Sequence, residues 1–292
     1  MASKPVVTGL FDPRTFSIQY VVADPETGKC AIIDPVLDYD EKSGTTATDS
    51  ADKILSFVAE HGLEVVWVLD THPHADHFTA AAYLKEKTGS PIAIGEKVVD
   101  VQKLWQGYHN SFGLKTNGSQ WDRLFAHGDT FSIGNLEARV MFSPGHTLAS
   151  ITYVIGDAVF VHDTLFMPDS GTARADSPAA VPSNCGLPFR TYSRFQKKRV
   201  SLSGTTISPV GASRAGKPPS ESRRQRTHMS VYKTEEEFVA ARQTRDKTLA
   251  MPKLILHALQ VNINAGRLPE PEANGRSYLK LPLNLLRGAA WG

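Results

Sequence analysis

The chain has 292 residues, 41% of them hydrophobic, and its formal net charge is +2, a composition that predicts a globular protein with a buried core and excludes a disordered or fibrous chain. The N-terminus lacks the apolar stretch of a signal peptide, and no run of about 18 uncharged apolar residues occurs. The two cysteines, Cys30 and Cys185, offer no disulfide framework, so we expect a cytoplasmic protein that does not associate with a membrane.

The first half of the chain mixes strand and helix patterns. Short apolar runs rich in β-branched residues predict strands, and apolar residues spaced three and four apart predict helices. The predicted strands are residues 17–22, 30–34, 65–69 and 92–94, and the predicted helices are residues 50–61, 78–86 and 96–105. A turn sequence, Asp-Pro-Glu-Thr-Gly, separates the first two strands, which we therefore expect to form an antiparallel hairpin.

The second half begins as a series of strands. The predicted strands are residues 131–133, 136–142, 150–155 and 158–161, with Gly-Asp and Gly-Asn pairs between them that are typical of turns. This pattern predicts a β-meander. A helix is expected from Thr234 to about Leu249, because three acids occupy its first turn, where the helix dipole favours negative charge.

The most informative segment is Thr71-His72-Pro73-His74-Ala75-Asp76-His77. It follows the strand at 65–69 and precedes a helix, and such loops at the carboxyl ends of strands carry the chemistry of many α/β enzymes. Neutral imidazole is the most common protein ligand for zinc and a frequent one for iron. Four ligand-type residues within six positions therefore predict a metal site rather than a chance cluster of surface histidines.

Two later segments could add ligands to this loop. Ser143-Pro144-Gly145-His146-Thr147 places a histidine in a tight turn after a strand, and His162-Asp163-Thr164 places an acid at the end of another strand. Each residue alone is more often structural than catalytic. Their order after the histidine-rich loop makes a common site the better interpretation.

These three segments resemble the signature of the metallo-β-lactamase superfamily, which is a His-x-His-x-Asp-His loop, a distant Gly-His and an aspartate at a strand end. Within that superfamily the chain is most similar to the persulfide dioxygenases. Gly171-Thr172-Ala173-Arg174-Ala175-Asp176 resembles the Gly-x-x-Arg-x-Asp segment of that branch, and residues 251–262 resemble its longer bacterial members.

The resemblance implies a single domain over residues 1–292 with an α/β fold, the four-layer αββα sandwich of the superfamily. It implies that three residues form the catalytic iron site: His72, His146 and Asp163. The wider set of potential metal ligands is His72, His74, Asp76, His77, His146 and Asp163. Arg174 is expected to order the pocket or to contact glutathione, and a structural salt bridge is about equally probable for it.

The resemblance also implies a reaction, in which one Fe(II) per chain oxidises glutathione persulfide with O₂ to sulfite and glutathione. Two histidines and one carboxylate leave coordination positions open on Fe(II), which suits this chemistry. A rhodanese is a candidate partner. The alternative is a thioester hydrolase of the hydroxyacylglutathione hydrolase (glyoxalase II) type with one or two Zn(II) ions.

The segment from 177 to 229 differs from the rest of the chain. Between Cys185 and His228 it has ten Lys or Arg residues and one acid, and it is rich in serine and proline. This composition is typical of a disordered basic segment or a nucleic-acid tail, but we do not expect nucleic-acid binding, because the charges lie in a stretch rich in serine and proline. The histidine that the superfamily supplies late in the chain, in a Gly-His-Asp sequence, is absent here.

A shifted reading frame explains this segment better. If residues 177–227 are translated one base out of frame, Ser203-Gly204-Thr205-Thr206-Ile207 can be derived from codons for Gly-His-Asp-Tyr. We therefore hypothesise two compensating frameshifts, near Ser177 and Thr227. On this hypothesis the chain as written is a catalytically impaired, metal-binding relative of an active enzyme.

Overall fold

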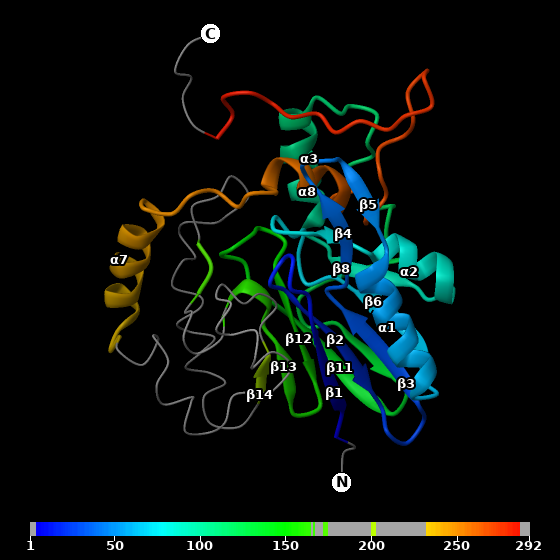
Figure 1. Ribbon diagram of the computed structural model, residues 1–292. Coiled ribbons are helices and arrows are strands. Elements are labelled where there is room, and N and C mark those ends of the chain that lie inside the picture. The colour runs from blue at the N-terminus through cyan, green and yellow to red at the C-terminus, as the bar shows by residue number, and fades with distance from the viewer. Residues whose placement is uncertain (1–3, 165, 167–171, 175–199, 203–231, 287–292) are drawn as a thin grey trace.

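The computed structural model describes residues 4–164, 166, 172–174, 200–202 and 232–286. Two sheets dominate it (Figure 1). The first contains, in spatial order, β1 (Val6–Phe11), β2 (Ile18–Ala23), β3 (Lys29–Ile33), β6 (Glu64–Leu69), β8 (Ile92–Gly95) and β9 (Arg123–Phe125). The second contains β10 (Thr130–Ile133), β11 (Leu136–Phe142), β12 (Ile151–Ile155), β13 (Ala158–Phe160) and β14 (Val200–Leu202).

The core lies between these two sheets. Along β11, Leu136, Ala138 and Val140 are buried while Glu137 and Arg139 are exposed, the alternation expected of a strand with one face on a core. The same cluster includes inward side chains of the first sheet, among them Ile33 and Leu69. The predicted meander is confirmed, since β10 to β13 pair in sequence and antiparallel.

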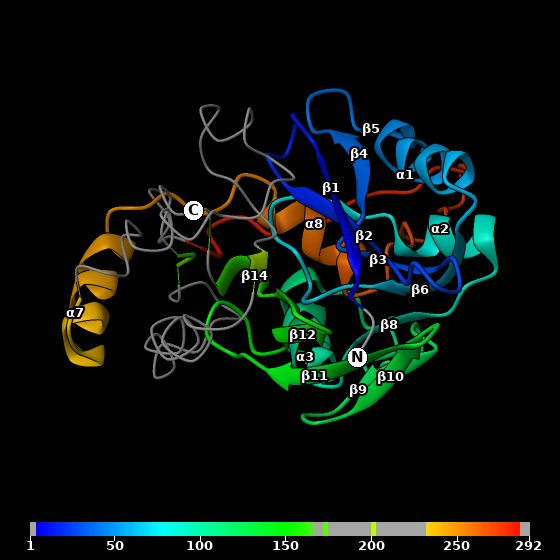
Figure 2. The same cartoon turned by 90° about the horizontal axis from the view of Figure 1, so that it is seen from below.

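Helices cover the outer face of each sheet. The helices α1 (Asp49–Glu60), α2 (Ala81–Thr88), α3 (Val98–His109) and α8 (Ile255–Asn262) contribute to one apolar cluster with the outer side chains of the first sheet. The helix α7 (Glu235–Asp246) places Phe238 in an apolar cluster with Val154 and Val159 of the second sheet and with Val161, which directly follows β13. Figures 1 and 2 show these layers, with α7 far from the other helices. The predicted four-layer αββα sandwich is therefore confirmed.

The first sheet changes direction at β3. The hairpin of β2 and β3 is antiparallel, as predicted, whereas β3, β6, β8 and β9 are mutually parallel. The carboxyl ends of β3 and β6 therefore meet at one edge of the sheet, and the histidine-rich loop begins there.

A small third sheet corrects one predicted boundary. It contains β5 (Thr45–Ala47), β4 (Val36–Asp40) and β7 (Phe78–Thr79), so residues 78–79 form a strand where we expected the start of a helix. The ring of Phe78 stacks on Tyr39 of β4 with centroids 4.3 Å apart, and this packing outweighs the helical preference of the segment.

Most of segment 177–229 lies outside the described residues, so the single domain over 1–292 stays a prediction. Among the described helices, none has the length and apolar character needed to span a membrane.

The helix α3 carries a buried titratable group, His109, which is 2% exposed. Burial favours the neutral ring and lowers the pKa of His109 from 6.5 to about 4, although the Leu256 carbonyl acts in the opposite direction. Between pH 6.5 and 4 the unfolded chain therefore binds a proton that the folded chain does not.

We expect the free energy of unfolding to fall as the pH falls from 6.5 to about 4, because this depressed histidine favours the fold only while it is neutral. The replacement His109→Phe should make the pH dependence shallower in urea titrations across this range. An unchanged slope in that variant would show that other groups cause the acid sensitivity.

Candidate metal centre

The histidine-rich loop is held at the edge of the first sheet by Asp34, which directly follows β3. The Asp34 carboxylate accepts hydrogen bonds from the backbone N–H of Thr71 at 2.7 Å and from its hydroxyl at 2.8 Å. The carbonyl of Thr71 accepts from the N–H of Ile151, which belongs to the second sheet, at 3.0 Å. The loop is therefore fixed to both sheets at the point where the potential ligands begin.

One group of potential ligands contains His72, His146 and Asp163. One ligand atom from each lies within 4.8 Å of the other two. The Nε2 atoms of His72 and His146 lie 3.8 and 3.5 Å from the same carboxylate oxygen, Oδ2 of Asp163. Three separate segments of the chain thus bring two imidazoles and one carboxylate to a common point, as the sequence predicts.

The other nitrogen of each imidazole ring has a protein partner. Nδ1 of His146 donates to the backbone carbonyl of Arg174 at 3.0 Å, and Nδ1 of His72 lies 3.1 Å from the hydroxyl of Thr71. Such outer contacts orient a histidine and select the tautomer that leaves Nε2 free to bind a metal. The rings are therefore oriented for coordination through Nε2.

Unsatisfied buried nitrogens show that these residues fit a metal ion. Among the described residues, Nε2 of His72 and Nε2 of His77 are buried and have no hydrogen-bond partner. A buried polar atom without a partner is costly unless a ligand satisfies it. Burial, followed by the neighbouring histidines, lowers the pKa of His72 well below its usual value, so its ring is neutral and Nε2 has a free lone pair.

A second group, His74, Asp76 and His77, lies beside the first. The ring centroids of His72 and His74 are 4.1 Å apart, and those of His74 and His77 are 4.2 Å apart. Nδ1 of His77 lies 3.3 Å from the Asp76 carboxylate, which leaves its unpartnered Nε2 for a metal ion. These residues could hold a second ion.

His74 is fixed by the same aspartate that holds Thr71. Its Nε2 lies 3.1 Å from Oδ1 of Asp34, so Nδ1 is the atom available for coordination. Burial acts against the charged ring, but the carboxylates of Asp34, Asp70 and Asp76 together outweigh it and raise the pKa of His74 to about 9. In the metal-free protein at neutral pH, His74 therefore carries a proton that an incoming cation must displace.

His162, which precedes Asp163, belongs to none of the three groups of potential ligands among the described residues, the third being Asp34, Asp70 and His74. Its ring is buried 5.1 Å from that of His72, and Nε2 lies within 3.0 Å of the hydroxyls of Ser143 and Thr164. Burial keeps the pKa of His162 well below its usual value. We infer that this neutral ring packs against the centre and braces the turn that carries Asp163.

Arg174 is buried, and its guanidinium donates to the carbonyl of Ala250 at 2.6 Å. Its own carbonyl is the acceptor for His146. The residue therefore links a potential metal ligand to the segment between α7 and α8. Its contact with glutathione stays a prediction.

Two residues that support the site were not singled out from the sequence. Asp34 directly follows an apolar strand, and this position could have marked it, because strand ends carry many functional carboxylates. Asn262 at the end of α8 donates to the carbonyls of His74 and His77. No local pattern marks Asn262, because its partners are far away in the sequence.

A family model named Metallo-beta-lactamase superfamily matches residues 14–251. The chain belongs to the metallo-β-lactamase superfamily. Members of this superfamily bind metal ions, and the clustered histidines and aspartates provide potential ligands. The chain is accordingly a member of a superfamily of metal-dependent enzymes, in which both hydrolases and dioxygenases occur.

Comparison with known proteins shows what the chain is similar to. The chain is 59% identical over 293 residues to a beta-lactamase hydrolase-like protein of Agrobacterium fabrum, covering 99% of the chain and 67% of that protein. It is 25% identical over 198 residues to the mitochondrial persulfide dioxygenase ETHE1 of Bos taurus, covering 68% of the chain and 64% of that protein. The crystal structure of ETHE1 from Myxococcus xanthus superposes with a TM-score of 0.67 and 26% identity, covering 90% of the chain and 100% of that structure.

Proposed function

We propose that this metallo-β-lactamase superfamily member is a mononuclear iron dioxygenase that acts on glutathione persulfide. The observation that carries the proposal is the convergence of two imidazoles and one carboxylate, His72, His146 and Asp163, from three segments. Such a two-histidine, one-carboxylate set is typical of non-haem Fe(II) oxygenases. The similarity to ETHE1 proteins supports the same assignment.

The proposed reaction converts glutathione persulfide, O₂ and water to glutathione, sulfite and two protons. The S–S bond breaks, the outer sulfur is oxidised, and O₂ is reduced. Fe(II) on this ligand set would supply the O₂ chemistry and keep coordination positions open. The chain itself keeps His72 and His146 oriented through Thr71 and Arg174 and supplies the negative charge of Asp163.

The test is metal analysis and O₂ uptake after anaerobic purification. We expect one iron per chain, and one O₂ consumed and one sulfite formed for each glutathione persulfide. Two zinc ions per chain, with thioester cleavage and no O₂ consumption, would overturn the proposal. That outcome would establish the thioester hydrolase instead.

The hydrolase of the glyoxalase II type remains the second candidate because His74, Asp76 and His77 form a second potential ion site. The replacement His77→Ala separates the two functions. A one-iron dioxygenase should retain its iron content and O₂ uptake, since its three ligands are untouched. A two-metal hydrolase should lose its second ion and most of its thioester cleavage.

The proposed partners follow from the proposed chemistry. A rhodanese, which carries sulfur as a persulfide, would supply the substrate, and we propose a cytoplasmic location for the reaction. We expect little binding of nucleic acid, because the charges of segment 177–229 are interspersed with serine and proline. Filter binding at low and high salt would test this, since phosphate contacts are strongly salt-dependent.

A further inference from the structure

One side chain of the C-terminal helix α8, that of Asn262, hydrogen-bonds to the backbone of the histidine-rich loop. Asn262 is 1% exposed, and its amide nitrogen donates to the carbonyls of His74 and His77, both at 2.7 Å. Its amide oxygen accepts from the backbone N–H of Thr79 at 2.8 Å. Both N–H groups and the oxygen of this amide thus form hydrogen bonds with the backbone of residues 74–79.

The backbone around Asn262 closely follows the surface of the loop and the start of α2. Gly266 has a positive φ of 83°, and a Cβ atom there would lie 2.5 Å from the carbonyl of Thr79. The side chain of Gln102 in α3 donates to the carbonyl of Ile263 at 2.8 Å. These contacts hold the backbone on the C-terminal side of Asn262. The position of the Asn262 amide is therefore set by this turn as well as by its own hydrogen bonds.

We propose that Asn262 is a positioning residue that sets the geometry of the metal-binding loop before any ion binds. The carbonyls that it holds belong to His74 and His77, whose rings lie in the second group of potential ligands, and His72 is two residues before His74. Fixing these two peptide groups fixes the directions in which the imidazoles leave the backbone. The inference concerns the loop that carries His72 and the second group of potential ligands, so it does not rest on the identity of the proposed reaction.

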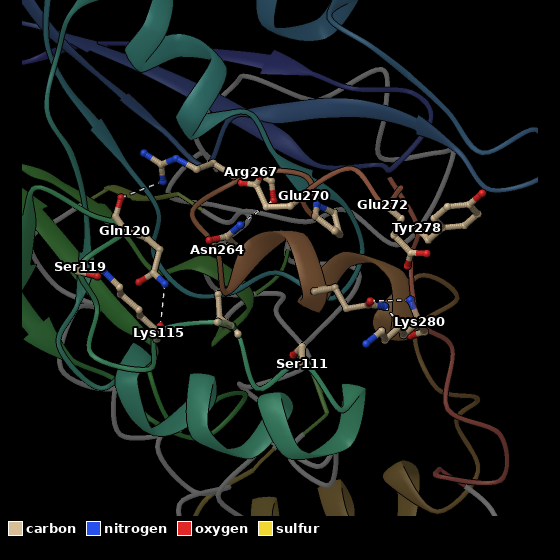
Figure 3. A pocket seen from close by; sticks show the side chains of 14 residues that line it. Ser111, Lys115, Ser119, Gln120, Asn264, Arg267, Glu270, Glu272, Tyr278 and Lys280 are labelled. Carbon is tan, nitrogen blue, oxygen red and sulfur yellow. Dashed lines mark hydrogen bonds between the residues drawn. The ribbon is translucent and has the colours of Figure 1, made fainter. Parts of the chain in front are cut away.

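The chain offers a matched control close to this residue. Asn264 also carries a side-chain amide, but it donates to the carbonyl of Arg267 at 3.2 Å. It lines a surface pocket of about 610 Å³ rather than the metal loop (Figure 3). The replacement Asn264→Ala removes the same group from the same turn without touching residues 74–79.

The test compares Asn262→Ala with Asn264→Ala in the metal-free full chain, by titration with Co(II) against a competing chelator. We expect Asn262→Ala to bind Co(II) about 10- to 100-fold more weakly, the range found when groups that orient metal ligands are removed. Its Co(II) absorption spectrum should also change, because the spectrum reports ligand geometry. Asn264→Ala should keep the parent affinity and spectrum. A folded Asn262→Ala protein with parent affinity and spectrum would overturn the proposal.

A measurement on the unmodified chain keeps the proposal testable if the variant does not fold. The Thr79 amide donates to Asn262 and should exchange slowly with deuterium in the metal-free protein, because this hydrogen bond is already formed before metal binds. Fast exchange of this amide without metal would show that the loop is not preset. Neither result depends on dioxygenase activity, so a failure here is distinguishable from a failure of the proposed reaction.

Discussion

The replacement Asp163→Asn is expected to abolish persulfide oxidation and to weaken iron binding more than about 100-fold. Removal of a group that merely orients a ligand costs 10- to 100-fold in metal affinity, and Asp163 is the shared partner of two imidazoles, at 3.8 and 3.5 Å. The amide has the shape of the carboxylate but not its charge. Iron content and O₂ uptake of the purified variant are the measurements.

The matched control for this variant is Asp157→Asn. Asp157 lies in the turn between β12 and β13 and pairs at the surface with Lys4, so the same chemical change there should leave iron content and rate unchanged. Iron content at the parent level in Asp163→Asn would contradict the proposed ligand set. Loss of iron in both variants would indicate a general effect of removing charge instead of a role in coordination.

Restoring the reading frame of codons 177–227 is expected to raise metal affinity and activity about 10- to 100-fold, the effect of supplying a missing outer-shell histidine. The strand β14 pairs in parallel with β13, and Leu202 is level with Phe160, three residues before Asp163. The described part of β14 therefore ends beside the strand that leads into the site. The hypothesised Gly-His-Asp sequence would begin immediately after it.

The nucleotide sequence provides the first check of this hypothesis. If a shift of one base between the two points does not give Gly-His-Asp, the frameshift hypothesis is wrong and the segment is a true insertion. If it does, the repaired and unrepaired chains should be compared for Co(II) affinity and O₂ uptake. Equal values for the two chains would show that the segment has no influence on the centre.

The sequence predicted most of the sandwich because its strands have one-sided or fully buried patterns. Alternation along residues 136–140 and the turn glycines around the meander are local signals, and the structure has strands there. The short strand Phe78–Thr79 was missed because its conformation depends on Tyr39, far away in the sequence. Local preference alone favours helix at that position.

The same division between local and distant signals holds for the candidate site. His72, His146 and Asp163 stand at loop and strand-end positions that their neighbours in the sequence reveal, and the structure brings them together. Asp34 and Asn262 act through contacts with the backbone of the loop. Such contacts leave no periodicity or motif. The strand-end position of Asp34 could have marked it, whereas only the folded chain identifies the role of Asn262.

The hydrogen bond between His146 and Arg174 makes the metal centre depend on residues that are far away in the sequence. Among the described residues, the grouped potential ligands lie before residue 164, but Arg174, whose carbonyl orients His146, is anchored on Ala250. A fragment that ends before residue 249 would contain these ligands and still lack this anchor. Removal of Ala250 should therefore weaken metal binding without removing any of these ligand atoms, so a metal-binding fragment should extend at least through Ala250.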